Sequence, residues 1–376
     1  MSDFETIKLG DVATYINGYP FKPEDRGSEG LPIIRIQDLT GNSYDLGFYN
    51  GTYPERIEIN DGDILISWSG SLGVYKWNNG KALLNQHIFK VVFDKKPIDQ
   101  EFFIFAVKYK LKEMASKTHG ATMKHIVKKD FDNTRIPFPP LSEQKLIAKK
   151  LLLVQSMIEK HNETLSKLDD LIKARFVEMF RNEHNENVPL INLIFAGAGL
   201  SYGIVVPGNY CERGIPMIRP SDFINRGLYL DKVYRVSPEI ENKYKRTRLE
   251  GNELLVQVIG QPGQIMLADE RCKGMNVTRN LAVIRIDPQM ANRIYVMEYM
   301  KTREAQAFML GATKQSTLKQ LPLKNLRELP IPVIDICKQN EFADFVAQVD
   351  KSKSAVQKSL DETQLLFDSL MQEYFG

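Results

Sequence analysis

The longest regular pattern along the chain is a seam of apolar residues that steps by alternating fours and threes, and it occurs twice. Each seam is apolar at eight of its ten positions, and neither contains proline. A mean spacing of 3.5 residues is typical of coiled-coil helices, so the pattern predicts two helices of about 35–40 residues, roughly 50–60 Å each at 1.5 Å per residue. The apolar seam positions are Ile147, Leu151, Val154, Ile158, Leu165, Leu168, Ile172 and Met179 in the first helix, and Phe342, Val346, Val349, Val356, Leu360, Phe367, Leu370 and Tyr374 in the second.

Four polar residues interrupt the seams: His161 and Arg175 in the first, Lys353 and Thr363 in the second. We expect them either to fix the register of pairing at some cost in stability or simply to lie exposed at an imperfect seam. Two such helices in one chain pair most simply with each other. An antiparallel pair would place two globular parts at opposite ends of a rigid bar.

A proline-rich mark precedes each predicted helix, and the two marks are the clearest sign of an internal repeat. RIPFPPLSEQ begins at Arg135, and ELPIPVIDICKQ begins at Glu328. Proline cannot continue a helix from within, and it biases the preceding residue toward extended structure. The marks therefore end the globular part of each copy, and Ser142 and Asp335 are the expected N-caps of the helices.

Other segments return in the same order, which identifies a tandem duplication. LPIIRIQDL from Leu31 returns as IPMIRPSDF from Ile215, and NQHIFKVVFD, ending at Asp94, returns as TRNLAVIRID, ending at Asp287. Short β-rich runs, such as 64–67, 88–93 and 281–286, and one helical stretch per copy, near 99–116 and 295–310, predict the fold class α+β. The predicted organisation is a globular domain at 1–140, a spacer helix at 141–182, a second globular domain at 183–334 and a spacer helix at 335–376, with the helices forming an antiparallel coiled coil.

Composition bounds the class of protein. A chain of 376 residues with 43% hydrophobic and 26% charged residues has the balance of two folded domains of ordinary size. No run approaches the roughly 18 consecutive apolar residues of a membrane span, and the N-terminal sequence lacks the features of a secretion signal. Cys211, Cys272 and Cys337 lie far apart, which argues against a zinc ribbon or a disulfide framework and fits a reducing cytoplasm.

The net charge of +3 is mild, so a partner with many phosphates would have to be met by local basic patches. One patch runs from 108 to 129, where lysines far outnumber acids, and the equivalent stretch runs from 301 to 324. Cations beside short amide and hydroxyl side chains suit a DNA contact, and the alternative is a solvated helix face. The candidate DNA contacts are Lys117, Thr122, Lys124 and Lys128 in the first patch, and Lys314, Gln315 and Lys319 in the second.

A polar glycine loop in each copy is a second candidate interface. The first is SWSGSLGVYKWNNGK from Ser67, and the second is QVIGQPGQ from Gln257. Asparagine and glutamine can pair with adenine and arginine with guanine, so the loops and the polar residues after them are suited to reading bases. The frameworks repeat while the loops differ, as expected if each domain reads its own sequence. The candidate contacts are Ser69, Lys76, Asn78, Lys81 and Gln86 in the first copy, and Gln261, Gln264, Lys273 and Arg279 in the second.

No stretch of the sequence forms a convincing catalytic site. FAGAG at 195–199 resembles a cofactor loop of methyltransferases, but its counterpart in the first copy keeps only one glycine, and no NPPY or NPPF tetrapeptide accompanies it. Asp231 with Glu241 and Lys243 imitates a short nuclease pattern that the first copy lacks. The histidines and cysteines have no zinc spacing, and no GxSxG elbow is present. The chain is therefore predicted to be non-catalytic, with no cofactor or metal of its own.

Together these features resemble the specificity (S) subunit of type I restriction-modification systems. The resemblance covers essentially the whole chain and rests on the duplicated mark "IP.P…Q" (136–144 and 329–339), on the "IP.IR..D" segment of each copy and on "G.LL" strands near 62–66 and 251–255. The second copy departs by about two extra residues before Gln339. The resemblance implies that the globular domains are target recognition domains 1 and 2, each reading one half of a bipartite site on double-stranded DNA.

The resemblance also implies partners. Two modification (M) methyltransferase subunits, which carry S-adenosylmethionine, would dock on the helices, and restriction (R) subunits, with ATP and Mg, could join them. Arg35, Asp38, Arg219 and Asp222 match the family pattern, and we expect them to brace the domains rather than to read bases. Two alternative interpretations stay open: a free-standing DNA-bridging or scaffold protein, and a self-sufficient methyltransferase.

Overall fold

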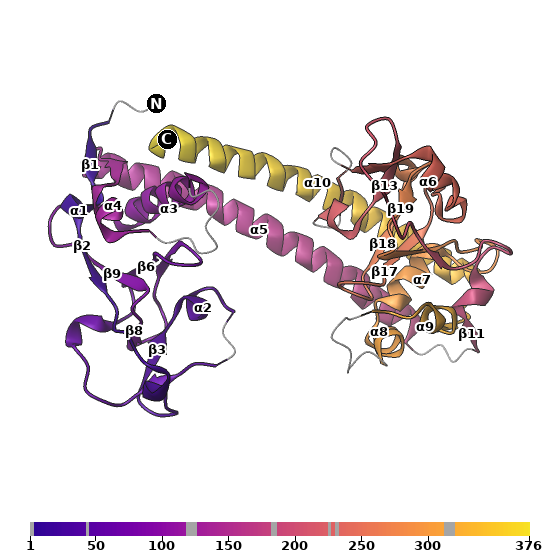
Figure 1. Cartoon of the computed structure of the whole chain (residues 1–376), viewed down its shortest axis with the longest axis horizontal. Helices are drawn as coiled ribbons and strands as arrows, with labels where there is room; N and C mark the ends of the chain where they lie inside the picture. The colour runs from indigo at the N-terminus through magenta and orange to yellow at the C-terminus, as the bar shows by residue number, and fades with distance from the viewer. Residues whose placement is uncertain are drawn as a thin grey trace. The chain divides into compact units, whose positions relative to one another are not determined.

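The chain forms two units, each of which combines one globular head with half of each long helix. The computed structural model describes residues 4–42, 45–117, 126–181, 186–224, 227–229, 233–311 and 320–376. Unit 1 comprises Met1–Glu163 and Gln357–Gly376, and unit 2 comprises Thr164–Val356. We call residues 4–140 head 1 and residues 186–335 head 2. Figure 1 shows the chain coloured by residue number.

Head 1 contains two four-stranded sheets and one two-stranded pair. The first sheet is antiparallel, in the order β2 (Thr14–Asn17), β9 (Ile88–Val92), β6 (Ile64–Ser67) and β7 (Gly73–Lys76). The second has the order β4 (Phe48–Tyr49), β3 (Leu31–Ile34), β8 (Ala82–Leu84) and β5 (Glu58–Ile59), with β3 and β8 parallel. The pair joins β1 (Thr6–Lys8) to β10 (Arg135–Pro137), so the proline mark is itself a strand.

Head 2 repeats this topology, except that its second sheet has three strands instead of four. Its first sheet has the order β12 (Ser201–Tyr202), β20 (Leu281–Ile284), β17 (Leu254–Gln257) and β18 (Ile265–Leu267). Its second has the order β16 (Tyr234–Val236), β13 (Ile215–Ile218) and β19 (Asn276–Val277), again with the last two parallel. The second proline mark, β21 (Pro330–Pro332), pairs with β11 (Asn187–Pro189), and β14 (Phe223–Ile224) pairs with β15 (Gly227–Leu228). The duplication seen in the sequence therefore extends to the strand order.

The helices of the two heads correspond less closely than the strands. Head 1 contains α1 (Leu9–Val12), α2 (Ile36–Leu39), α3 (Gln100–Lys117) and α4 (Lys128–Asn133), and head 2 contains α6 (Pro238–Asn242), α7 (Arg293–Met300), α8 (Arg303–Leu310) and α9 (Leu323–Arg327). The single helix predicted near 295–310 is wrong, because two helices occupy that stretch. Thr302 interrupts it: its Oγ1 accepts a hydrogen bond from the Ala305 amide at 3.3 Å and caps α8.

Gly18 and Gly203 occupy matched turns after β2 and β12, where the chain passes close to a neighbouring strand. A Cβ added at Gly18 would lie 2.2 Å from the Asn85 carbonyl oxygen, and one at Gly203 would lie 1.9 Å from the Val277 oxygen. No side chain can be accommodated at such distances. The two glycines therefore allow the same close approach of backbone segments in both heads.

The long helices α5 (Leu141–Phe180) and α10 (Ile336–Phe375) are 40 residues each and pair antiparallel within each unit. In unit 1, Lys150 near the start of α5 lies beside Tyr374 near the end of α10, with Nζ and the hydroxyl 3.5 Å apart. In unit 2, Asp169 of α5 lies beside Lys353 of α10, 3.0 Å apart. None of the helices in the described part of the chain is long and apolar enough to cross a membrane.

Every predicted seam position is buried or half-buried. Of the polar residues in the seams, Lys353 forms an ion pair with Asp169, and Arg175 reaches an acid of α10. Thr363 is 8% exposed and donates to a carbonyl one turn back in its own helix. His161 is half-buried. These polar residues thus lie within the helix pair rather than on an open face.

The two long helices begin differently. Asp335 caps α10 as expected, since its Oδ1 accepts from the Cys337 amide at 2.9 Å. The prediction that Ser142 caps α5 is wrong, because α5 begins at Leu141 and Ser142 lies inside the first turn. The first free amides of α5 instead reach the carbonyl of Pro140, as the Glu143 and Gln144 amides do at 2.8 and 3.0 Å.

A buried glutamine ends each proline mark and fastens the helix to its head. Gln144 is 1% exposed, and its Oε1 accepts from the Asp99 amide of head 1 at 2.9 Å. Gln339 is 2% exposed, and its Oε1 accepts from the Asn292 amide of head 2 at 2.8 Å. Each side-chain amide also donates to a carbonyl at the end of the mark. The motif "IP.P…Q" thus has a structural cause, because the glutamine satisfies buried main-chain groups on both sides of the joint.

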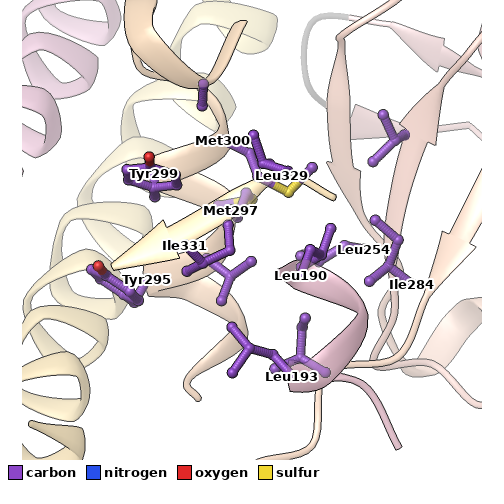
Figure 2. Packing of buried hydrophobic residues seen from close by; sticks show 14 of the residues in the cluster. Leu190, Leu193, Leu254, Ile284, Tyr295, Met297, Tyr299, Met300, Leu329 and Ile331 are labelled. Atoms are coloured by element: carbon purple, nitrogen blue, oxygen red, sulfur yellow. The ribbon is translucent and has the colours of Figure 1, made fainter. Parts of the chain in front are cut away.

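Apolar packing completes the joint between each head and the helix pair. In unit 2 the core runs from the sheet residues through Tyr295 to the long helices (Figure 2). The ring of Tyr295 stacks on Phe176 of α5 at 5.8 Å and meets Phe180 edge-on at 5.0 Å. In unit 1, Phe102 of α3 contacts Phe375 of α10 with ring centroids 5.3 Å apart. Aromatic pairs of this kind contribute about 0.5–1.5 kcal/mol beyond their buried area, so each head is held firmly to its half of the helix pair.

Candidate nucleic-acid interface

Three connecting segments and the end of the first basic segment meet at one place in head 1. The Gln86 amide donates to the Tyr19 carbonyl at 3.0 Å, and the Trp68 amide donates to the His87 carbonyl at 3.4 Å. The Ile126 amide in turn donates to the Trp68 carbonyl at 3.0 Å. These bonds bring together the glycine loop after β6, the polar residues after β8 and the segment that follows the basic stretch. We call this place, defined by these five residues, the loop junction of head 1.

Head 2 has the same junction with the same hydrogen bonds. The Arg279 amide donates to the Ile204 carbonyl at 2.9 Å, and the Val258 amide donates to the Asn280 carbonyl at 2.8 Å. The Leu321 amide donates to the Val258 carbonyl at 2.8 Å. The two kinds of segment that the sequence singled out, the glycine loop and the basic stretch, are thus joined at one point in each head.

The two junctions share a main-chain frame but carry different side chains. Exposed Gln86 and exposed Arg279 occupy matched positions. His87, whose ring lies 5.5 Å from that of Trp68, matches Asn280. The Gln86 Nε2 lies 3.3 Å from the His87 Nε2, whereas among the described residues no partner is found for the Arg279 guanidinium. An amide in one head and a free cation in the other offer different hydrogen-bonding groups to the same kind of surface.

Three candidate lysines of head 1 are already paired with acids of the same head. Lys76 lies 3.0 Å from Glu101, Lys81 lies 2.8 Å from Glu58, and Lys128 lies 2.8 Å from Asp132. The hydrogen bond from Lys81 lowers the pKa of Glu58, and the same bond raises the pKa of Lys81. A phosphate would have to compete with these carboxylates, although all three pairs are partly exposed and weak.

The remaining candidates fall into different environments. Ser69 is 5% exposed and lies inside the head. Asn78 and Lys273 are exposed. Gln264 donates to Gln261 at 2.6 Å, and both line a cavity of about 1060 Å³ between head 2 and its half of the helix pair. That cavity carries both acids and lysines, so it does not present a basic surface to a polyanion.

Some of the predicted contacts lie outside the described residues or at their edge. Thr122 and Lys124 in the first basic segment belong to the part that is not described, as do Lys314, Gln315 and Lys319 in the second. The side chain of Lys117 at the end of α3 is likewise not described. After these parts, the described chain resumes at the loop junctions, with Ile126 in head 1 and Leu321 in head 2.

The arginine–aspartate pairs of the "IP.IR..D" segments brace the heads. Arg35 Nε lies 3.1 Å from Asp38 Oδ2, and Arg219 donates to both oxygens of Asp222, at 3.3 and 2.9 Å. The hydrogen bond to Asp222 raises the pKa of Arg219. In both copies the aspartate also accepts the arginine's own amide and closes a short turn. These residues match the expected structural role.

The nuclease-like pattern does not form a metal site among the described residues. Glu241 is 1% exposed, and it accepts hydrogen bonds from Arg248 and from the Asn276 side chain. The bond from Arg248 lowers the pKa of Glu241, so the carboxylate stays ionised and engaged. Lys243 is exposed, and Asp231 lies outside the described residues. Glu241 therefore has a structural role in head 2, where it links Arg248 to Asn276.

One surface that the sequence interpretation missed lies in head 2 beside the FAGAG turn. A hollow of about 270 Å³ is lined by this turn and by four basic residues, Lys245, Arg246, Arg248 and Arg285. Three of them come from the short run KYKRTR (243–248), whose charge density was visible in the sequence but lay outside the two basic segments, and Arg285 follows strand β20. The glycine motif and the basic run are about 50 residues apart, so only the fold brings them together.

Comparison with known proteins gives consistent matches over both repeats. A family model described as the type I restriction modification DNA specificity domain matches residues 1–170 and 206–363. The type I restriction enzyme EcoBI specificity subunit of Escherichia coli is 26% identical over 400 residues, which cover 97% of this chain and 83% of that protein. The MjaVIII specificity subunit of Methanocaldococcus jannaschii is 23% identical, over 95% of this chain and 90% of that protein.

A solved structure has the same fold. The S subunit of the type I restriction-modification system of M. genitalium superposes with a TM-score of 0.53 at 15% sequence identity. The match covers 100% of this chain and 97% of that one. At this level of identity the likeness concerns the fold, which includes two heads and two long helices.

Proposed function

The chain belongs to the family of type I restriction modification DNA specificity proteins, and we propose that it reads a bipartite site on double-stranded DNA, with one half-site for each head. The observation that carries this proposal is the pair of loop junctions. The same main-chain frame presents Gln86 in one head and Arg279 in the other. Glutamine pairs with the edge of adenine and arginine with that of guanine, so the two heads are suited to different sequences.

Phosphate contacts would position each head before bases are read. Asn78 and Lys273 are exposed and available for such contacts. Lys76, Lys81 and Lys128 would exchange an internal carboxylate for a phosphate, which limits what each adds to affinity. The described chain resumes after each basic stretch at a loop junction, at Ile126 in head 1 and at Leu321 in head 2, so each junction lies next to a basic stretch in the sequence.

The long helices are the proposed docking surface for two modification subunits. Leu146, Leu153 and Met157 of α5 are 53%, 63% and 44% exposed, and their spacing places them on one side of the helix. An apolar stripe of this kind, with Lys145 and Lys149 beside it, is typical of a protein–protein contact. Those subunits would supply S-adenosylmethionine and methyl transfer, and restriction subunits would bring ATP and Mg. This chain would work in the cytoplasm as their non-catalytic reader.

Mapping methylated adenines in the host genome tests the proposal directly. We expect a split sequence motif to be methylated in the wild type and unmethylated when this gene is deleted. Complementation with Arg279→Ala should restore methylation with one base position of one half-site relaxed, since the bidentate contact is worth about 1–3 kcal/mol of discrimination. Complementation with Lys273→Ala, a neighbouring exposed lysine, is the matched control and should leave the motif unchanged.

Two results would contradict the proposal. Methylation that persists at the same motif after deletion would mean that another protein chooses the site. Methyl transfer to DNA by the purified chain alone, given S-adenosylmethionine, would make it a self-sufficient methyltransferase. A scaffold protein without such partners would instead bind DNA but capture no modification subunit in a pull-down from its host.

A further inference from the structure

We infer that the hollow beside the FAGAG turn of head 2 binds a phosphate group, and that DNA outside the half-site supplies it. The assignment of the phosphate to DNA rests on the proposed function, but the phosphate chemistry does not. The hollow, of about 270 Å³, is lined by Gly197 and Ala198 on one side and by the KYKRTR run on the other. Neither segment belongs to the loop junction.

Two cations at the hollow are available to a ligand. Arg248 is held by Glu241, and Arg285 is held by buried Glu253 at 3.1 Å. Lys245 and Arg246, by contrast, are exposed and form no ion pair with the described residues. One acid, exposed Glu250, also lines the hollow, which leaves a net positive charge among the unpaired groups.

The backbone on both sides of the hollow is held in place. Gly197 has φ +80° and Gly199 has φ +60°, a left-handed conformation that glycine adopts without strain. The Ala198 amide donates to the Phe195 carbonyl at 3.0 Å, which closes the turn and fixes this side of the hollow. The Arg285 guanidinium donates to the carbonyls of Arg246 and Arg248, which fixes the basic run against the sheet. A phosphate would therefore meet groups that are already positioned.

Head 1 carries a different charge pattern at the matched place. The 3-10 turn Glu55–Ile57 of head 1 corresponds to the 3-10 turn Lys245–Thr247 of head 2. Each turn comes just before a segment that pairs with the matching strand region, which is β8 in head 1 and the stretch that leads into β19 in head 2. Glu55 stands where head 2 has Lys245, and Glu58 stands where head 2 has Arg248. Arg56 keeps the charge of Arg246, so two of the three basic positions that the run contributes to the hollow are acidic in head 1, and the shared fold does not require the basic character of the run.

The test uses the full chain and a labelled duplex carrying the mapped site. Lys245→Ala with Arg246→Ala should weaken binding about tenfold at 0.15 M salt and lower the slope of log affinity against log salt by about one to two. The loss should be equal for matched and mismatched duplexes, and the methylated sequence should not change. Arg56→Ala at the matched turn of head 1 is the control and should leave the salt slope unchanged.

A second measurement separates the sources of phosphate. Inorganic phosphate or ATP, added without DNA, should raise the melting temperature of the wild type more than that of the double variant if a free ligand occupies the hollow. A phosphate-dependent shift with an unchanged DNA salt slope would assign the hollow to a free phosphate ligand. If neither the slope nor the melting temperature responds to the substitutions, the inference is overturned. If the wild type shows no sequence-specific binding, the proposed function fails, and the melting experiment still decides the hollow.

Independently, we infer that charged pairs in the unit 2 seam make α5 pair with α10 rather than with α5 of a second copy. Lys353 Nζ lies 3.0 Å from Asp169 Oδ1, with side chains only 21% and 16% exposed. Arg175 reaches Glu341 at 3.2 Å. Both pairs join α5 to α10.

These pairs favour α5–α10 pairing because the matching positions of the repeat do not carry the same charges. Aligning Gln144 with Gln339 places Ile158 opposite Lys353 in the repeat and Gln364 opposite Asp169. Two α5 helices from different copies would set Asp169 against Ile158, and two α10 helices would set Lys353 against Gln364. The first arrangement takes the cation of α10 away from the partly buried Asp169, and the second leaves Lys353 with only Asp350 of its own helix, so each loses an ion pair at a partly buried position.

Co-expression of two differently tagged full-length copies tests this selectivity. Asp169→Gln with Lys353→Ile makes the seam symmetric, and it should raise capture of the second copy at least several-fold over the wild type. Exchanging the charges, Asp169→Lys with Lys353→Asp, keeps the α5–α10 pair and should give wild-type capture. Capture no greater for the symmetric seam than for the wild type would overturn the inference. Should that variant not fold, Arg175→Leu with Glu341→Leu poses the same question at the more exposed pair.

Discussion

Replacing residues 183–334 with the matching head of a relative should change one half of the methylated sequence and leave the other half intact. Each head has its own sheets, its own core and its own loop junction, and head 1 is left untouched by the exchange. The chimera should therefore recognise the half-site that the transplanted head recognises in the relative. The expected effect is a complete switch at every base position of one half-site.

The exchange must preserve the joint to the helices. The new head needs an aromatic residue at the position of Tyr295, which contacts Phe176 and Phe180, and an amide that reaches Gln339. Methylation mapping of the chimera gives the result, and re-insertion of the native head by the same route is the control. A change in both half-sites would refute independent reading by the two heads.

The broad architecture could be predicted because it repeats. Matched segments in the sequence correspond to matched strands, and the proline marks are the strands β10 and β21. The seams followed from spacing alone, since burial on one side of a helix imposes a 3.5-residue period. Local exceptions could not be predicted in the same way. The break at Thr302 depends on a single capping hydrogen bond, and the start of α5 at Leu141 depends on the carbonyl of Pro140.

The candidate site was predicted less completely, for a physical reason. Gln86 and Arg279 were identified from their chemistry, but the junction that holds them is made of main-chain bonds between distant segments, such as Ile126 to Trp68. Main-chain bonds leave no residue-type signal. The pairing of Lys81 with Glu58 is likewise not visible in the sequence, although it neutralises a cation that had been expected to be free. The basic hollow was missed because its two halves are separate in the sequence.

Inserting one heptad into each long helix, after Lys160 and after Lys358, should lengthen the gap between the methylated half-sites by about three base pairs. Both points lie close to the boundary between the units, at 163/164 and 356/357, so neither head is disturbed. Seven residues keep the seam in phase and add about 10.5 Å of helix. At about 3.4 Å per base pair this is three steps along the duplex.

The half-site sequences themselves should not change, because the loop junctions are untouched. Three base pairs also rotate the duplex by nearly a third of a turn at 10–10.5 base pairs per turn. If the added helix cannot follow that rotation, binding to every gap should fail. A heptad in α5 alone is the matched control, since it puts the unit 1 contact of Lys150 with Tyr374 and the unit 2 pair of Asp169 with Lys353 out of register with each other and should destabilise the helix pair. Methylation mapping of the double insertion decides the question: an unchanged gap at full activity would mean that the helices do not set the distance between the half-sites.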